Sequence, residues 1–595
     1  MLDYGLVGNC ITAALVSKEG NVEWMCYPYL DSPSVFAKIL DKEGGEFKVA
    51  PQCKHKITQK YMGDTNILET RFTSRSSSFR ILDFFPRYKR GRKIIKHNCL
   101  IRIIEPLKGT PEIKIKFDPR MNYAKDDTKI KDMGDHFEVS CKDKRMSLKT
   151  NVSLFNDDPF VLKHRVFFLF GDHEDLENID VKEVLRLFRS TKTYWEKWSG
   201  SLVTPKRYRG LIIRSALVLK LMTYSDTGAI IAAPTTSIPE ELGSTRCFDY
   251  RLCWVRDGAY TVDALNKIGR EHEAKRFIDF IMDKMYRDDH IQILYGIHGE
   301  TDLKERTLPH LEGFMGSKPV RIGNAAYNQR QNDVYGEMLD IMYLYLVYYE
   351  IEKKITYKQW RFIRWLVNQI KFKWSRKDAG IWEFRGGDQH FVYSKLMCYI
   401  GVDRAVKIAL NHNKDKYADE WASLREDIKN DLIKNGYDDE LKSFVMHYGS
   451  KELDASILHM AYHEFLGPND PLIINSVRAI HKNLRKGELV QRYKIEDDFG
   501  VSRSSFTLCS FWMIDALVYI GEVEKAQEMF QKLISHSNHL GLFSEDIDIK
   551  SKKLIGNFPQ AYAHVAIINT SILLSEWSAK RKKIDWGETR RNKWL

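Results

Sequence analysis

Four segments of the sequence combine acidic, basic and aromatic side chains between stretches of helical pattern. They are FDYRLCWVRDGAY at 248–260, LEGFMGSKPVRIGNAAYNQRQNDVYGE at 311–337, DAGIWEFRGG at 378–387 and GLFSEDIDIKSKKLIGNFPQAYAHVA at 541–566. In sugar-binding sites aromatic faces stack on the apolar faces of pyranose rings, while Asp, Glu and Arg side chains bind the hydroxyl groups. We therefore interpret these segments as parts of a carbohydrate site.

Hydrolysis of a glycosidic bond needs two carboxyl groups, one protonated and one ionised, on opposite sides of the scissile bond. Glu383 is our candidate for the general acid, because Ile381, Trp382 and Phe384 could desolvate it and raise its pKa. Arg385 would oppose this effect if its guanidinium turned the same way. The alternative is an ordinary loop carboxylate.

Glu545 is our candidate for the general base. It lies in an acidic loop with Asp546 and Asp548, where we expect it to stay ionised and to hold a water molecule. Two alternatives remain open for this loop: an acidic turn that only connects helices, and a cation site formed by the three acids.

Further side chains in these loops could bind a ligand. Arg256 and Asp257 adjoin directly after Trp254, at the expected start of a helix, where an ion pair or a helix cap would explain them equally well. Tyr295 in LYGIHGE and Arg321 in PVRIGN could instead be packing residues. The candidate substrate-binding residues are Trp254, Arg256, Asp257, Tyr295, Arg321, Trp382 and Arg385.

The elements that must position these residues differ along the chain. Over residues 1–182 short runs alternate apolar and polar side chains, and EIKIKFD at 112–118 places Ile113, Ile115 and Phe117 on one face. A period of two is typical of half-buried strands, and many short strands favour an antiparallel β-sandwich. Comparable runs are NILETRF, FRILDFF, CLIRIIEPL, HFEVSC and FVLKHRVFFLF.

The period becomes helical from about residue 183. We assign 183–206 to a linker helix and 207–595 to six antiparallel helix pairs closed into an (α/α)6 barrel. Loops held by such a rigid scaffold are where binding and catalytic residues concentrate. The twelve expected helical stretches are 207–224, 257–268, 272–287, 331–350, 357–373, 393–412, 415–433, 454–465, 473–485, 506–519, 522–536 and 561–577.

Composition and motifs exclude several classes of protein. The 595 residues are 43% hydrophobic, yet no run approaches the roughly 18 apolar residues of a membrane span, and the N-terminus does not have the pattern of a signal peptide. GxGxxG, Walker A, HExxH, GxSxG and EF-hand motifs are all absent from the sequence, so we expect no cofactor and no metal. Nine scattered cysteines without a CxxC pair are typical of reduced thiols, so we expect a cytoplasmic protein.

The net charge of +13 is concentrated in clusters such as KRGRK at 89–93 and KRKK at 580–583. Because no nucleic-acid-binding motif accompanies these clusters, we interpret them as solvated surface charge. We therefore expect neither nucleic acid nor a membrane as a partner, and leave a homo-oligomer open.

Several long motifs, in the same order along nearly the whole chain, resemble the glucoamylase family, which includes prokaryotic glucoamylases, glucodextranases and α,α-trehalases. They include YGLVGNCITAALVSKEGNVEWMCYPYLDSPSVFAKIL, GAIIAAPTTSIPEELGSTRCFDYRLCWVRDGAY, LYGIHGE, PVRIGNAA, GIWEFRG, SKLMCYIGVDRAV, GLFSEDID and IGNFPQAYAHVA. The resemblance implies a β-sandwich, a linker helix and a catalytic (α/α)6 barrel that hydrolyses α-glucosidic bonds with inversion. It also implies that Glu383 is the general acid and Glu545 the general base, and that Arg256 and Asp257 bind the non-reducing glucose.

The chain departs from the family pattern at three places: Tyr29 where Arg is common, SEDID in place of SEEYD, and Gly258 in place of Ala. The first two changes leave the substrate open between malto-oligosaccharide and trehalose. The alternatives to an exo-acting hydrolase are an inverting disaccharide phosphorylase, in which phosphate replaces the base, and a non-catalytic carbohydrate-binding protein. Retention of both Glu383 and Glu545 favours the hydrolase.

Overall fold

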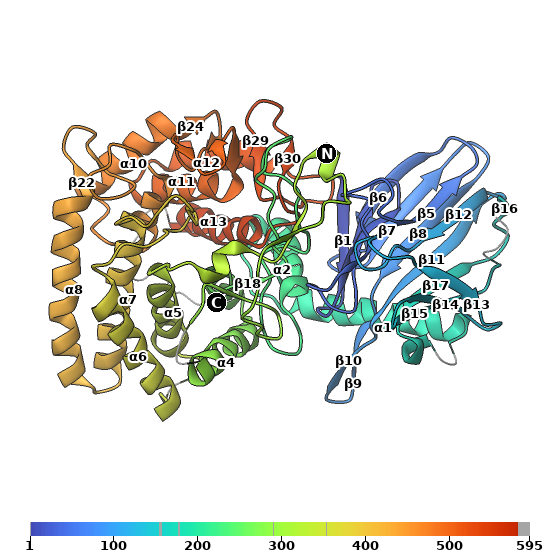
Figure 1. The fold of residues 1–595 in the computed structure, drawn as a ribbon, viewed down its shortest axis with the longest axis horizontal. Coiled ribbons are helices and arrows are strands. Elements are labelled where there is room, and N and C mark those ends of the chain that lie inside the picture. Colours follow the sequence, from blue (N-terminus) through green and yellow to red (C-terminus); the bar gives the residue numbers. More distant parts are fainter. Residues whose placement is uncertain (1, 154–157, 177–178, 289–290, 353, 581–595) are drawn as a thin grey trace.

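The computed structural model describes residues 2–153, 158–176, 179–288, 291–352 and 354–580. Its N-terminal part consists of two antiparallel sheets, and its C-terminal part consists of helices (Figure 1). This arrangement confirms the predicted β-sandwich and (α/α)6 barrel.

One sheet has the strand order β1-β2-β3-β5-β12-β16, with β4 beside β3, and the other has the order β13-β14-β15-β17-β11-β8-β7-β6. The first contains β1 (Tyr4–Gly8), β2 (Ala13–Ser17), β3 (Val22–Cys26), β4 (Ser34–Phe36), β5 (Glu46–Pro51), β12 (Glu112–Asp118) and β16 (Phe160–Val161). The second contains β6 (Lys56–Tyr61), β7 (Leu68–Thr73), β8 (Ser78–Phe84), β11 (Cys99–Lys108), β13 (Lys129–Asp132), β14 (Phe137–Cys141), β15 (Lys144–Thr150) and β17 (Val166–Gly171).

Aromatic side chains join the two sheets. The ring of Phe47 in β5 meets that of Phe168 in β17 edge to face, with centroids 5.2 Å apart, and both side chains are buried. β12 covers the predicted residues 112–118, and the register of β12 against β5 pairs Ile115 with Val49. The period of two therefore identified this strand and its inward face.

A hairpin of β9 (Arg87–Arg90) and β10 (Lys93–Lys96) extends from the sandwich in Figure 1. It carries the basic cluster 89–93, whose residues are all exposed, as expected for solvated charge. The other basic cluster, 580–583, lies at and beyond the end of the described residues.

Helix α1 (Val181–Gly200) follows the sandwich. It begins before the predicted residue 183, because the Asp180 side chain accepts a hydrogen bond from the Glu183 backbone N–H at 2.8 Å and caps the helix there. It ends at Gly200, so residues 201–206 are not part of it. The domain boundaries at 182 and 206 stay a proposal.

A helix lies in each of the twelve stretches predicted beyond the linker. Within 454–465, however, the α-helix covers only His459–Tyr462, and within 331–350 it ends at Tyr343; the other ends are shifted by at most a few residues. The helices are α2 (Arg209–Met222), α3 (Val255–Lys267), α4 (Glu271–Asp288), α5 (Asp333–Tyr343), α6 (Tyr357–Lys373), α7 (Val392–Asn411), α8 (Asp415–Gly436), α9 (His459–Tyr462), α10 (Pro471–Leu484), α11 (Thr507–Tyr519), α12 (Val523–Ile534) and α13 (Ala561–Lys580). A 3-10 turn, Ala455–Leu458, precedes α9, and a π turn, Leu344–Tyr348, follows α5.

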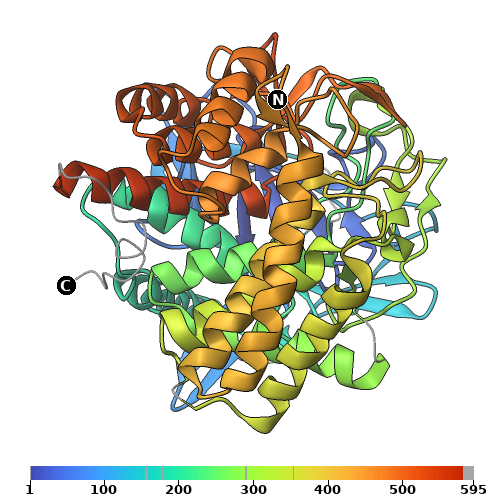
Figure 2. The same cartoon turned by 90° about the vertical axis from the view of Figure 1, so that its left-hand side faces the viewer.

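Helices α3, α5, α7, α9, α11 and α13 form the inner ring, and α13 packs against both α2 and α3 to close it. Every residue of α11 is buried, which is typical of a helix that is surrounded on all sides by protein. Figure 2 views the molecule from the side of α8, with the helices in front of the sheets. Within the described ranges, no helix is long and apolar enough to cross a membrane.

Candidate active site

A pocket of about 910 Å³, including its open mouth, lies at the N-terminal ends of the inner helices α3, α5, α7, α11 and α13. Its wall is formed by side chains from the loops that lead into these helices and from their first turns. They are Ala232, Glu240, Arg246, Phe248, Tyr250, Trp254, Arg256, Asp257, Asn324, Ala326, Gln329, Ile381, Trp382, Glu383, Phe384, Arg385, Arg492, Tyr493, Asp497, Asp498, Phe499, Phe506, Trp512, Gln560 and Tyr562. Aromatic rings, carboxylates and guanidinium groups are thus mixed around one cavity, as a sugar site requires.

Glu383 faces this pocket, and its carboxylate is held from two sides. Its Oε1 accepts a hydrogen bond from the Trp254 indole at 2.8 Å and another from the Arg256 guanidinium at 3.3 Å. The backbone of Glu383 is left-handed, with φ of 60°. Gln329 supports this conformation, because its amide donates to the carbonyl oxygens of Glu383 and Phe384 at 3.0 and 3.1 Å. A non-glycine residue in this region is strained, and such strain is concentrated at functional sites.

Two neighbours of Glu383 turn away from its carboxylate. The Arg385 guanidinium forms an ion pair with Glu305 at 2.9 Å. The contact between Arg385 and the Glu383 carboxylate that the sequence left open is therefore not formed. The Trp382 indole donates to both carboxylate oxygens of Asp454 at 3.0 Å, which fixes the ring in the wall. Trp382 and Arg385 nevertheless both line the pocket, and substrate binding by them stays a prediction.

Arg256 and Asp257 lie in the first turn of α3 and also line the pocket. Besides Glu383, the buried Arg256 guanidinium binds Gln331 at 2.8 Å and Asp333 at 3.1 Å. Burial raises the pKa of Asp257 to about 7. Arg256 forms its ion pairs with Asp333 and Glu383, and among the described residues no side chain caps α3. An ion pair between Arg256 and Asp257, or a helix cap, is therefore not supported, and ligand binding by the two residues stays a prediction.

Glu545 is placed differently from the expectation of an open acidic loop. Only 1% of the residue is exposed, it is absent from the pocket wall, and its Oε2 accepts a hydrogen bond from the Asn557 backbone N–H at 3.0 Å. Burial, then Glu240 and Asp546, raise the pKa of Glu545 well above its usual range. The expectation that Glu545 stays readily ionised in a polar loop is therefore wrong.

The tertiary structure explains this burial. The segment after Glu545 forms strand β29 (Asp546–Asp548), which is enclosed between β28 (Ser504–Phe506) and β30 (Leu554–Ile555). Tyr250, which lines the pocket, connects the two glutamates: its hydroxyl lies near Glu545, and its pKa is raised by burial and by the charges of both Glu545 and Glu383. Glu545 thus lies directly behind the wall that Glu383 faces.

Glu240 replaces Asp548 as the third acid of this cluster. Carboxylate oxygens of Glu240, Glu545 and Asp546 lie within 4.8 Å of one another, whereas Asp548 accepts a hydrogen bond from the Ser551 N–H at 2.6 Å. Oxygen ligands at this spacing could hold a hard cation. Two guanidinium groups, those of Arg492 and Arg246, already supply positive charge here.

Two candidate ligand contacts do not line the pocket. Tyr295 is 1% exposed, and its strand β19 (Leu294–Tyr295) pairs with β18 (Cys253–Trp254), so it supports the backbone of Trp254. Arg321, in β21 (Arg321–Ile322), donates to the carbonyl oxygens of Thr245 and Cys247 at 2.7 Å each. A direct contact of either side chain with a ligand in this pocket is thus not supported.

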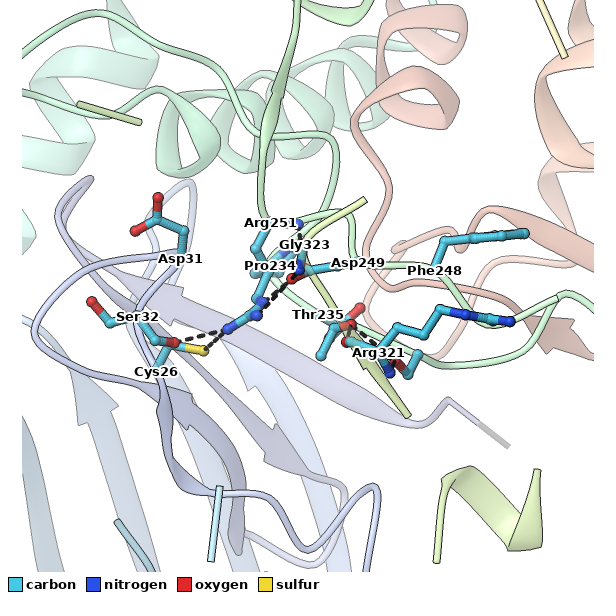
Figure 3. A network of polar contacts seen from close by, with 12 residues as sticks. Cys26, Asp31, Ser32, Pro234, Thr235, Phe248, Asp249, Arg251, Arg321 and Gly323 are labelled. Atoms are coloured by element: carbon cyan, nitrogen blue, oxygen red, sulfur yellow. Dashed lines mark hydrogen bonds and ion pairs between the residues drawn. The ribbon is translucent and has the colours of Figure 1, made fainter. Parts of the chain in front are cut away.

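A network of polar contacts fixes the loop that leads into α3 (Figure 3). The buried Arg251 guanidinium pairs with Asp249 at 2.7 Å and reaches the sandwich, where it donates to the Ser32 carbonyl oxygen at 2.8 Å. Asp249 also accepts a hydrogen bond from the Gly323 N–H at 3.1 Å, next to Arg321. The sandwich therefore helps to position the loop that carries Tyr250 and Trp254.

Sequence reasoning missed part of the wall. The segment RYKIEDDFG at 492–500 supplies Arg492, Tyr493, Asp497, Asp498 and Phe499, and its mixture of acids and aromatics is the signal that could have found it. It also missed Glu240, whose segment SIPEELG looks like an ordinary polar loop.

Two of the three departures from the family pattern have a structural account. Tyr29 lies outside the pocket and packs edge to face on Tyr224 and His298, with centroids 6.0 and 4.7 Å away. At Gly258 a Cβ atom would lie 2.1 Å from the Phe277 ring, so this helix pair packs too closely for Ala.

An (α/α)6 barrel with a carboxylate held by Trp and Arg in an aromatic-lined pocket defines a glycoside hydrolase of the glucoamylase and trehalase group. Residues 206–572 match the family of glycosyl hydrolases 15, and residues 3–156 match the trehalase-like N-terminal family. The chain therefore belongs to glycosyl hydrolases family 15.

Proteins similar to this chain include a trehalase of Thermoplasma volcanium, 34% identical over 97% of this chain and 94% of that protein. A trehalase of Thermoplasma acidophilum is 35% identical, covering 95% and 99%, and one of Mycobacterium tuberculosis is 33% identical, covering 96% and 89%. A bacterial glucoamylase solved with acarbose shares the fold, with a TM-score of 0.71 and 14% identity over 99% of this chain and 95% of that one.

Proposed function

We propose that this protein hydrolyses α,α-trehalose with inversion, using Glu383 as general acid and Glu545 as general base. The observation that carries the proposal is the pocket in which Trp254 and Arg256 orient the Glu383 carboxylate. The choice of trehalose over malto-oligosaccharide is supported by the full-length similarity to trehalases from two genera.

In the proposed reaction Glu383 donates its proton to the oxygen between the two glucose units as the bond to the anomeric carbon breaks. A water molecule attacks that carbon from the opposite face and gives a proton to Glu545. Arg256 and Asp257 would bind hydroxyl groups of the glucose unit that is attacked. The attacked unit leaves as β-glucose and the other as α-glucose.

The buried position of Glu545 is compatible with this role. A carboxylate with a raised pKa is a stronger base once it is ionised, so it takes a proton from water more readily. Tyr250 and Glu240 are the side chains through which its cluster meets the pocket. Activity should therefore rise with pH as Glu545 loses its proton.

The test measures products from purified protein given trehalose, maltose, maltotriose or isomaltose, with and without phosphate. Proton NMR of the first turnovers should show α- and β-glucose in equal amounts from trehalose, before mutarotation. Initial release of α-glucose alone would contradict inversion, and faster hydrolysis of maltose would contradict the substrate. Formation of glucose 1-phosphate would point to the phosphorylase.

We also propose that the protein acts in the cytoplasm. All nine cysteines are free thiols in the structure and eight of them are buried, which is typical of a protein kept in a reducing compartment. Self-association stays a prediction.

A further inference from the structure

Glu240 is a residue of the pocket wall to which the proposed mechanism assigns no step. It lies in the segment between α2 and α3, and its backbone N–H donates to the Arg246 carbonyl oxygen at 3.1 Å. The residue is only 2% exposed, yet it contributes to the pocket wall. Its carboxylate meets Glu545 from the pocket side, with oxygens of the two groups within 4.8 Å of each other.

Two arginines hold the Glu240 carboxylate in place. Its Oε2 accepts a hydrogen bond from the Arg492 guanidinium, and the Arg246 guanidinium lies 3.9 Å from the same oxygen. Arg246 is shared, because it also pairs with Asp497. Glu240 is therefore fixed as one partner of a buried ion-pair network.

The charges in this network do not balance. Four carboxyl groups (Glu240, Glu545, Asp546 and Asp497) are met by two guanidinium groups (Arg246 and Arg492), so full ionisation would leave two buried negative charges in excess. Such an excess is costly in a low-dielectric site, and a carboxyl group without an ion pair retains its proton instead. Neither arginine forms an ion pair with Glu545. The titratable and charged groups that face Glu545 or its two acidic neighbours are Glu240, Asp546, Arg246, Arg492, Tyr250, Cys247 and Cys509.

We propose that Glu240 is a positioning residue for the general base: its arginine-held negative charge, fixed beside Glu545, adds to the effect of burial in strengthening Glu545 as a proton acceptor, and so moves the acidic limb of the pH–rate profile to higher pH. The inference rests on the proposed role of Glu545. When Glu545 takes the proton of the attacking water, its repulsion with Glu240 disappears, so the transition state is stabilised relative to the ground state.

The test compares pH profiles of kcat and kcat/KM on trehalose for the wild type and Glu240→Gln. The amide keeps an acceptor for Arg492 but removes the charge. We expect the acidic limb to move to lower pH by about one unit or more, and kcat on the plateau to fall about tenfold or more, because a weaker base accepts the proton less readily.

Two variants control for a purely structural role. Glu273→Gln also removes a buried carboxylate from an ion pair, with Lys220 at 2.8 Å, but outside the pocket wall, so it should lower stability without moving the acidic limb. Glu240→Asp keeps the charge and should lie closer to the wild-type profile than Glu240→Gln does. If the Glu240→Gln limb coincides with that of the wild type, the inference is overturned.

Failure of the proposed function would be recognised separately. A wild type inactive on every α-glucoside contradicts the function, and a Glu545→Gln variant that keeps full activity contradicts the base assignment, whatever Glu240 does. A cation site at this cluster would give a different result. EDTA would abolish the activity, and Mg²⁺ would restore it only when Glu240 is present; this outcome would overturn the inference.

A spectroscopic measurement covers the case in which Glu240→Gln does not fold. The infrared difference spectrum between the wild type and Glu545→Gln should contain a protonated-carboxyl band that persists well above the pH at which an ordinary glutamate ionises, about 4.3. A band that titrates in that ordinary range would show that the cluster does not hold the proton, and would overturn the inference.

Discussion

At the scale of single residues, the carboxylate of Glu383 is oriented by partners that differ in kind. The Trp254 indole is a neutral donor at 2.8 Å, and the Arg256 guanidinium is a charged donor at 3.3 Å, both to the same oxygen. The Gln329 amide donates to the backbone carbonyl oxygen of Glu383 and so supports its strained left-handed backbone. This contact helps to hold the Glu383 side chain in one position in the pocket wall.

We expect Glu383→Gln and Glu545→Gln each to lower kcat at least about a thousandfold, because in the proposed mechanism each of these groups transfers a proton in the transition state. Circular dichroism should show that both variants keep their fold. The matched control is Glu420→Gln, an exposed residue paired with Lys371, which should keep kcat within twofold of the wild type. Activity within tenfold of the wild type for either glutamine variant would remove that glutamate from the mechanism.

Asp257 carries a cost in stability that depends on pH. Burial raises its pKa to about 7, against an ordinary value of about 3.9. Between these two values the folded state retains a proton that the unfolded chain has released, so stability falls as the pH rises through this window and the cost is complete above it.

The variant Asp257→Asn is neutral at every pH and should remove this cost. Its free energy of unfolding relative to the wild type should be near zero at about pH 4 and favourable by about 1–3 kcal/mol at about pH 8, while kcat/KM falls at least about a hundredfold. Urea unfolding at both pH values measures the first effect. Asp439→Asn, at a side chain that is 92% exposed, should show no such pH dependence, and the same flat behaviour in Asp257→Asn would contradict the argument.

At the scale of elements, the site depends on how closely α3 and α4 pack. Gly258 lies one position after Asp257 in α3, and a Cβ atom there would lie 2.1 Å from the ring of Phe277 in α4. A side chain at this position would require the Phe277 ring or one of the two helices to shift.

Gly258→Ala should therefore destabilise the protein by about 2 kcal/mol or more through overpacking. Gly210→Ala is the matched control, since nothing lies within 4 Å of a Cβ atom at that position in α2, and it should be neutral or stabilising by up to about 1 kcal/mol. Thermal unfolding measures both changes. Adding Phe277→Leu should recover part of the loss, and a Gly258→Ala variant as stable as the control would show that the helices separate freely.

At the scale of the whole molecule, the sandwich supports one wall of the pocket. The indole of Trp24 in β3 donates to the Pro234 carbonyl oxygen at 2.6 Å, and Arg251 reaches from the barrel to Ser32. Both contacts hold the segment of the barrel that contains Glu240 and Tyr250. The N-terminal part thus supports the pocket wall, although the wall residues among those described all come from residue 232 onward.

Replacing Arg251 by Gln should weaken the loop that leads into α3, because it removes the guanidinium partner of the buried Asp249 and the contact with the Ser32 carbonyl oxygen. We expect a loss of about 3–5 kcal/mol in the free energy of unfolding and a lower kcat/KM. Urea unfolding and trehalose kinetics measure these effects. Arg186→Gln removes an exposed pair with Glu183 and should change stability by less than about 1 kcal/mol. Equal effects of the two variants would show that the Arg251 network is dispensable.

The sequence by itself determined the elements and the first carboxylate of the site. Strand β12 and the twelve helices beyond the linker follow from apolar periods, because a strand or helix must bury one face and that requirement is local. The aromatic residues around Glu383 in GIWEFRGG made it a candidate acid from the sequence alone, but the groups that hold its carboxylate, Trp254 and Arg256, come from another segment of the chain. Trp254, Arg256 and Asp257 were found together because they share one helix start.

Only the tertiary structure decided the charge state around Glu545 and the roles of Tyr295 and Arg321. Whether a loop acid is solvated depends on what covers it, and Glu545 is covered by strands β28 and β30 and by Glu240, which is distant in the sequence. The Arg321 guanidinium donates hydrogen bonds to two backbone carbonyl oxygens, and no local sequence pattern indicates these contacts. The pKa of a carboxyl group is a property of its desolvation and its neighbouring charges, and both arise only when segments from across the barrel come together.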